Sequence, residues 1–207
     1  MDRPIGAQWR EFAPADDGLQ SDALIVIMFE MGRIVEARDL AAQWRPSVPR
    51  CAFAGLELDL ADARPDLINL RALLFAALAG HGLQSGQMVL FGAGRAGRLA
   101  IEIGLLGVAP GAAVITLDIP LDTPQLIVAS AGTSVRMVQH RAPEDPQGTR
   151  FRAIVETFKR QHVDIRSQLL PEREGSNPRV PLRAAGAFLA EMAAHVSRLA
   201  HTAGPWQ

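Results

Sequence analysis

The stretch from residue 87 to residue 108 constrains the fold more than any other part of the chain. It opens with an apolar run of strand length at residues 88–91, and Gly92, Gly94 and Gly97 follow at once. Glycines at this density let a chain turn sharply. A largely apolar segment then continues with the length of a buried helix. The sequence therefore predicts a strand, a tight turn and a helix.

Strand-like and helix-like segments alternate along the rest of the chain. Strands are predicted at residues 23–29, 50–58, 112–119, 135–140 and 165–170, and helices at residues 36–44, 67–79, 149–162 and 182–199. This alternation favours an α/β fold, a three-layer αβα sandwich with a mostly parallel sheet. Residues 1–22 carry no clear period and are predicted to be an irregular segment, whereas residues 23–207 are predicted to form a single domain.

The composition is that of an ordinary globular protein. Of 207 residues, 48% are hydrophobic and 21% charged, and the formal net charge of -1 gives no reason to expect nucleic acid or an anionic membrane as partner. The chain shows neither a signal-peptide pattern nor an apolar run of membrane-spanning length, so we expect a cytoplasmic protein. Its one cysteine, Cys51, is predicted to lie in the core. No metal site is predicted.

The three glycines also match the dinucleotide-binding pattern G-x-G-x-x-G. Such glycines let the backbone approach a pyrophosphate at the start of a helix. Asp118 lies 21 residues after Gly97, about where a ribose-binding acid is expected. On this interpretation Gly92, Gly94, Gly97 and Asp118 bind NAD or FAD. Against it, the dinucleotide unit normally opens its domain, whereas two predicted strands precede the glycines here.

The order of segments over residues 23–199 resembles the small carboxylesterase/phospholipase type of α/β hydrolases. The family pattern Gly-x-Ser-x-Gly-Gly lies over Gly92-Ala93-Gly94-Arg95-Ala96-Gly97. The loop Phe29-Glu30-Met31-Gly32 stands where the family has His-Gly-x-Gly after its first apolar strand. The Asp-Pro pair of the family's acid loop matches Asp145-Pro146.

The resemblance implies a catalytic site that has lost most of its chemistry. Gly94 takes the nucleophile position and offers no hydroxyl. The histidine position, residues 174–177, reads Glu-Gly-Ser-Asn and offers no imidazole. Asp145 would be the surviving triad acid, and the backbone N–H groups of Met31 and Arg95 would form the oxyanion hole. We therefore expect a non-catalytic member that needs no cofactor and binds a ligand or a partner.

Three charged residues are candidates for holding a ligand. The resemblance places Glu30, Arg95 and Asp145 on loops at the carboxyl edge of the sheet, where Arg95 would bind an anion. Alternatively, Arg95 forms a salt bridge with Glu30 or Asp145 that fills a disused cavity. A hydrolase with a rebuilt site also stays open, with Glu30, Asp145 or a relocated His140 as base. The expected partner is a small molecule or a protein, a homodimer being one arrangement. The sequence leaves open whether the loops at residues 121–134 and 171–181 close over the crevice.

Overall fold

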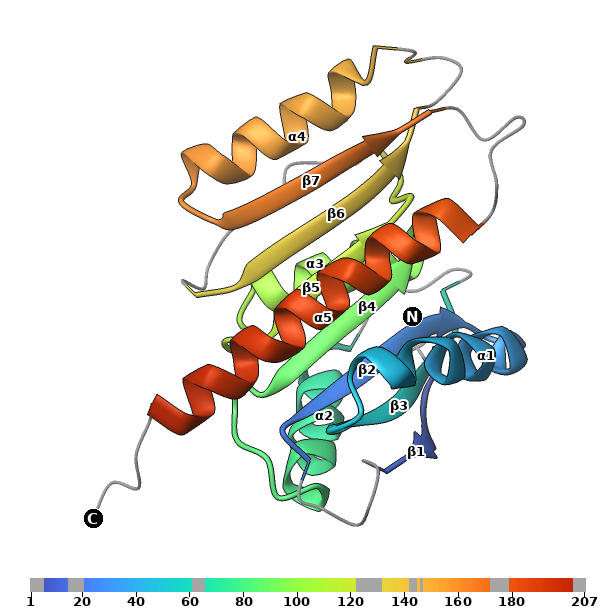
Figure 1. The fold of residues 1–207 in the computed structure, drawn as a ribbon, viewed down its shortest axis with the longest axis vertical. Helices are drawn as coiled ribbons and strands as arrows, with labels where there is room; N and C mark the ends of the chain where they lie inside the picture. Colours follow the sequence, from blue (N-terminus) through green and yellow to red (C-terminus); the bar gives the residue numbers. More distant parts are fainter. Residues whose placement is uncertain are drawn as a thin grey trace.

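The computed structural model describes residues 6–14, 21–60, 66–121, 132–141, 145, 147–171 and 179–202. Figure 1 shows a sheet through the middle of the molecule, with helices on both sides. The predicted three-layer αβα architecture is confirmed.

The sheet has seven strands in the order β1-β3-β2-β4-β5-β6-β7. The strands are β1 (Ala7–Ala13), β2 (Ala23–Glu30), β3 (Cys51–Leu58), β4 (Met88–Ala93), β5 (Ala113–Leu117), β6 (Ser134–His140) and β7 (Asp164–Leu170). All pairs are parallel except the antiparallel pair of β1 and β3. Strands β2 to β6 are buried over almost their whole length, as expected where helices cover both faces of a parallel sheet.

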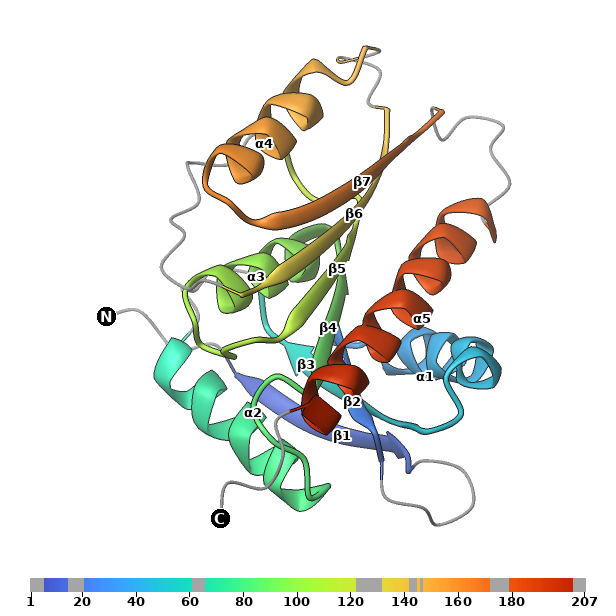
Figure 2. The ribbon, with the colours of Figure 1, turned by 60° about the vertical axis from the view of Figure 1, so that its left-hand side comes forward.

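The helices divide between the two faces. They are α1 (Ile34–Trp44), α2 (Leu67–Gly80), α3 (Gly94–Leu105), α4 (Thr149–Arg160) and α5 (Arg179–Thr202), with a short 3₁₀ turn at Arg45–Ser47. Helices α1 and α5 cover one face, and α2, α3 and α4 cover the other (Figure 2). Apolar side chains fill both interfaces between helices and sheet, which makes the sheet the centre of two core layers. No described helix is long and apolar enough to span a membrane.

A buried arginine ties α5 to the sheet. Arg136 of β6 is 2% exposed and forms ion pairs with Asp164 of β7, at 3.1 Å, and with Glu191 of α5, at 2.9 Å. The sequence showed only an isolated charge in an apolar strand. Its partners come from two elements that lie far away in the chain.

The prediction that residues 1–22 are irregular is wrong for the described residues 7–13, which form β1. This strand points Trp9 to the α2 side and Phe12 to the α1 side. Arg10 shares the side of Phe12 and donates to Glu57 of β3. On one face of β1, Arg10 stands at a position where an apolar residue would complete the alternating apolar pattern of a strand. The strand was therefore not recognisable from the sequence. Residues 122–131, the greater part of the predicted loop at residues 121–134, lie outside the described residues.

Within the described sheet, the side on which successive strands are added reverses at β2. The chain runs from β2 to β3 on one side, and β4 then joins the other side of β2. The pairing of β2 with β4 ends at Met28 and Gly92. In open α/β sheets, ligands bind beyond the carboxyl ends of the strands at such a switch point. The glycine turn after β4 and the loop after β2 lie at this place.

Candidate functional site

The turn between β4 and α3 is built by close backbone contact between two glycines. A Cβ atom on Gly92 would lie 2.6 Å from the nitrogen of Gly97, and one on Gly97 would lie 2.6 Å from the carbonyl oxygen of Gly92. Gly94, at the tip of the turn, has φ +56° and open space where a side chain would begin. The two outer glycines are therefore required by packing, whereas the middle one has room for a side chain.

Replacing Gly97 with alanine tests this account of the turn. Since the added methyl group meets backbone that cannot yield locally, we expect Gly97→Ala to lower the free energy of unfolding by about 1–3 kcal/mol. In Gly80→Ala, at the open end of α2, the added methyl group meets no atom, and stability should stay equal or rise. Denaturant unfolding of both variants is the measurement. Equal stability of Gly97→Ala and wild type would contradict the tight turn.

The loop after β2 uses its backbone donors within the fold. The Met31 N–H donates to the Leu58 carbonyl at 3.0 Å, which extends the ladder between β2 and β3. The Gly32 N–H donates to the Glu57 carboxylate at 2.9 Å. Only one of the two proposed oxyanion donors therefore remains, the Arg95 N–H in the first turn of α3, where amides have no partner within the helix.

Glu57 fixes that loop from the neighbouring strand. Its side chain accepts from the Gly32 N–H and from the Arg10 guanidinium, at 3.0 Å for Nη2. These bonds, the one from Gly32 foremost, hold the pKa of the Glu57 carboxyl below its ordinary value. Sequence reasoning missed this residue. A charged side chain inside a run of buried-strand residues was the signal that a partner had to exist.

Asp145 binds backbone at the start of α4. Its two carboxylate oxygens accept from the N–H groups of Thr149 and Arg150, both at 2.8 Å. Burial raises the pKa of Asp145, but these two bonds and the charge of Arg150 outweigh it, so that the pKa lies below its ordinary value. The predicted triad acid thus serves the helix terminus. Asp145 follows β6, which lies two strand spacings, about 10 Å, from β4, the strand that directly precedes Gly94.

The role of Asp145 predicts a pH dependence. A carboxyl whose pKa is lowered by folding stabilises the native state above its unfolded pKa, about 3.9, and this contribution is lost as the pH falls through the folded pKa. We expect Asp145→Asn to lower the melting temperature at neutral pH. The difference from wild type should shrink below about pH 4. Thermal melts over this range measure it, and a difference independent of pH would contradict the assignment.

Asp118 and His140 form a pair that the sequence had not joined. Asp118 directly follows β5 with φ +50°, a conformation uncommon outside glycine. Its carboxylate accepts from the His140 backbone N–H at 2.8 Å and lies 2.9 Å from His140 Nδ1. The pair arises because β5 and β6 are neighbours, Asp118 directly follows β5 and His140 is the last residue of β6. Asp118, the predicted ribose ligand, is engaged with this imidazole.

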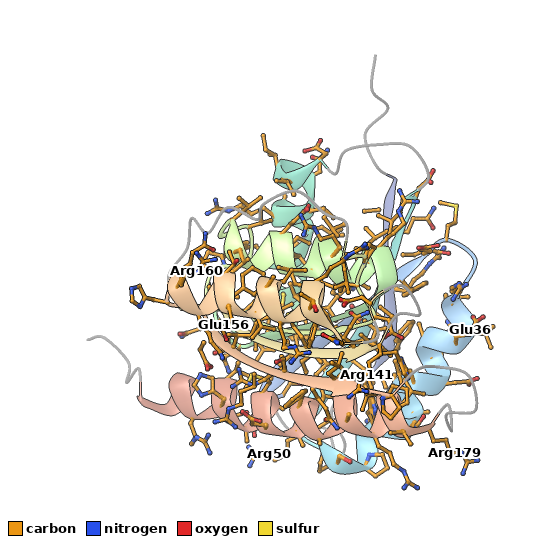
Figure 3. All side chains as sticks on the ribbon, turned by 90° about the horizontal axis from the view of Figure 1, so that it is seen from above. Glu36, Arg50, Arg141, Glu156, Arg160 and Arg179 are labelled. Carbon is orange, nitrogen blue, oxygen red and sulfur yellow. The ribbon has the colours of Figure 1, made fainter. Side chains whose placement is uncertain are left out.

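A pocket of about 150 Å³ opens at the switch point between β2 and β4. Its walls come from β2, β4 and α1, and its lining is Ile27, Met28, Phe29, Glu30, Arg33, Glu36, Ala37, Leu40, Phe91 and Ala93. Ala93 directly precedes Gly94, so the pocket adjoins the glycine turn. Glu30, a predicted ligand residue, lines it, and Arg33 and Glu36 are lining residues that the sequence did not single out. Figure 3 shows Glu36 on α1.

The other predicted ligand residues are not gathered here. Arg95 is exposed and does not line the pocket. It forms no ion pair with Glu30 or Asp145, all three of which the structure describes. The alternative of a salt bridge that plugs a disused cavity is therefore not observed.

The described histidine, cysteine and carboxylate side chains are the groups that could form a candidate metal site. The histidine position at residues 174–177 lies outside the described residues. Within the described ranges, no group of three such side chains could hold a metal ion. Burial raises the pKa of Cys51 to about 12, so its thiol stays protonated, and the predicted core position of this residue is confirmed.

Comparisons with known proteins identify the architecture. No protein-family model and no curated protein sequence matches the chain. Among solved structures, esterase PE8 superimposes with a TM-score of 0.64 at 20% identity, covering 92% of this chain and 100% of that one. Esterase 2 of Thermogutta terrifontis gives 0.64 at 13% identity, with 92% and 89% covered. A phospholipase/carboxylesterase of Dyadobacter fermentans gives 0.59 at 12% identity, with 89% and 95% covered. Identities this low establish the fold alone.

Proposed function

Since the chain has the α/β-hydrolase fold, we propose that it is a non-catalytic member that binds a small molecule in the pocket between β2 and β4. The observation that carries the proposal is Gly94. It stands at the tip of the strand-to-helix turn with a positive φ and open space before it. That is the place from which the fold presents a nucleophile, and glycine has none. Covalent acyl transfer therefore has no attacking atom at this turn.

Two further features support binding without acyl transfer. The Met31 N–H is engaged by the Leu58 carbonyl, so an oxyanion would meet one donor fewer. Residues 172–178, between β7 and α5, contain no histidine to act as base. The pocket itself does not depend on any of these groups, because its walls are side chains of β2, β4 and α1. The pocket between β2 and β4 is therefore present although the catalytic groups are absent from these positions.

A fluorophosphonate probe tests the proposal. We expect no covalent labelling at any serine and no hydrolysis of p-nitrophenyl acetate or butyrate above the rate of a boiled sample. The Gly94→Ser variant is the matched comparison: it restores a hydroxyl at the elbow without the histidine that would activate it, so it too should stay unlabelled. Labelling of the wild-type chain would overturn the proposal.

The Asp118–His140 pair favours a second candidate, a hydrolase with a rebuilt site. Asp118 lies against Nδ1 and would orient the imidazole, so that Nε2 could take a proton from water without a covalent intermediate. Nε2 has no hydrogen-bond partner among the described residues. This candidate predicts hydrolysis of the ester without covalent labelling by the probe, whereas the first proposal predicts neither hydrolysis nor labelling.

Substitution of His140 separates the two candidates. If the rebuilt site operates, His140→Gln and Asp118→Asn should each reduce turnover of p-nitrophenyl acetate by at least about 100-fold, the usual contribution of a general base. The control is His162→Gln, because His162 is an exposed imidazole on the turn after α4 and reports unspecific catalysis. Equal residual rates in His140→Gln and His162→Gln would eliminate the second candidate.

A further inference from the structure

The pocket between β2 and β4 has an apolar floor. Ile27 and Phe29 of β2, Phe91 of β4 and Leu40 of α1 contribute to it from the face of the sheet that α1 and α5 cover. Its volume of about 150 Å³ equals that of a hydrophobic cavity that admits one benzene molecule. The floor therefore suits a single aromatic ring or a branched alkyl group.

Three charged side chains line the mouth of the same pocket. Glu30 ends β2, Arg33 directly precedes α1, and Glu36 lies in the first turn of α1. All three are exposed, and none forms a hydrogen bond or ion pair with another described residue. The negative charge of Glu36 also lies at the positive, N-terminal end of the α1 dipole, where it stabilises the helix, so this residue has a structural role. Glu30 and Arg33 have no such role, although they lie at the edge of an apolar pocket.

The loop between β2 and α1 offers no free amide of its own to an anion. The N–H groups of Met31, Gly32 and Arg33 all donate within the protein, to Leu58, Glu57 and Glu30 respectively. A ligand carboxylate at this place can be held by the guanidinium of Arg33, a group suited to paired bonds with carboxylates, beside the N–H groups of the first turn of α1, which have no partner within the helix. The two glutamates in turn call for a cation. An ammonium group, with three donors, can serve both.

From these features we infer that the pocket binds an α-amino acid with an apolar side chain of about the size of a phenyl ring. The ring or branched chain fills the floor, the carboxylate meets Arg33, and the ammonium group meets Glu30 and Glu36. A neutral ester would leave all three charges without a partner. The inference rests on the proposed function, since it names the ligand class of the same pocket.

Three probes that share a phenyl group separate the contributions of the ligand's carboxylate and ammonium groups to its affinity. L-phenylalanine carries both charges, phenethylamine only the ammonium group, and hydrocinnamate only the carboxylate. Titrations followed by isothermal calorimetry should show L-phenylalanine binding at least tenfold more tightly than either of the others. Equal affinity of the three probes, or no binding of L-phenylalanine at millimolar concentration, would overturn the inference.

Substitutions at the mouth assign each charge. Arg33→Gln should weaken L-phenylalanine at least tenfold and leave phenethylamine unchanged, whereas Glu30→Gln should weaken phenethylamine and leave hydrocinnamate unchanged or tighter. The matched control is Glu156→Gln on α4, which Figure 3 shows far from Glu36 of α1. Loss of binding in the control as well would contradict the assignment. All variants are changed at exposed positions, and their melting curves verify folding.

A neutral probe keeps this inference distinct from the proposed function. If benzyl acetate binds and is recovered intact while L-phenylalanine does not bind, the ligand class is wrong and the proposed binding function stands. If neither binds, both are wrong. If benzyl acetate is hydrolysed, the non-catalytic proposal fails whatever the amino acid does.

Discussion

The backbone contact between Gly92 and Gly97 determines how β4 passes into α3, and the site depends on it. Because the two residues meet at a distance that no side chain allows, the chain reverses within one turn and Gly94 protrudes at the carboxyl edge of the sheet. The same turn places Ala93 in the wall of the neighbouring pocket. In α/β hydrolases a turn of this kind presents a nucleophile, yet here its geometry is set by its flanking glycines. It therefore persists when the central residue has no reactive atom.

The pocket and the elbow follow from one topological fact. Strand β2 has β3 on one side and β4 on the other, so the loops that leave β2 and β4 diverge and leave a space between them. Glu57 then fixes one side of the space by binding Gly32, and α1 closes it. Catalytic groups are additions to this arrangement. A chain can lose them and still keep a shaped, partly apolar cavity with charges at its mouth, which is the condition we propose for this protein.

Much of the fold could be predicted from the sequence, because buried parallel strands are continuous apolar runs and the glycine turn is local. Strand β1 was missed, since its Arg10 is compensated by Glu57 from another strand. The site was harder to predict because its groups meet only through the sheet order. Asp118 was considered as a ribose ligand and His140 as a relocated base, and their pairing depends on β5 and β6 being neighbours. Placement on adjacent predicted strand ends was the only signal that could have joined them.

The central claim is that a pocket has been kept and the chemistry beside it lost. One NMR titration tests both halves, with the methyl groups of the protein labelled and L-phenylalanine methyl ester as the added compound. This ester carries a ring and an ammonium group for the pocket and an ester bond for any catalyst. The account predicts that methyl signals of Ile27 and Leu40 shift as the pocket fills, while the ester decays only at its uncatalysed rate. Accelerated hydrolysis, or methyl signals of the pocket that do not respond, would contradict it.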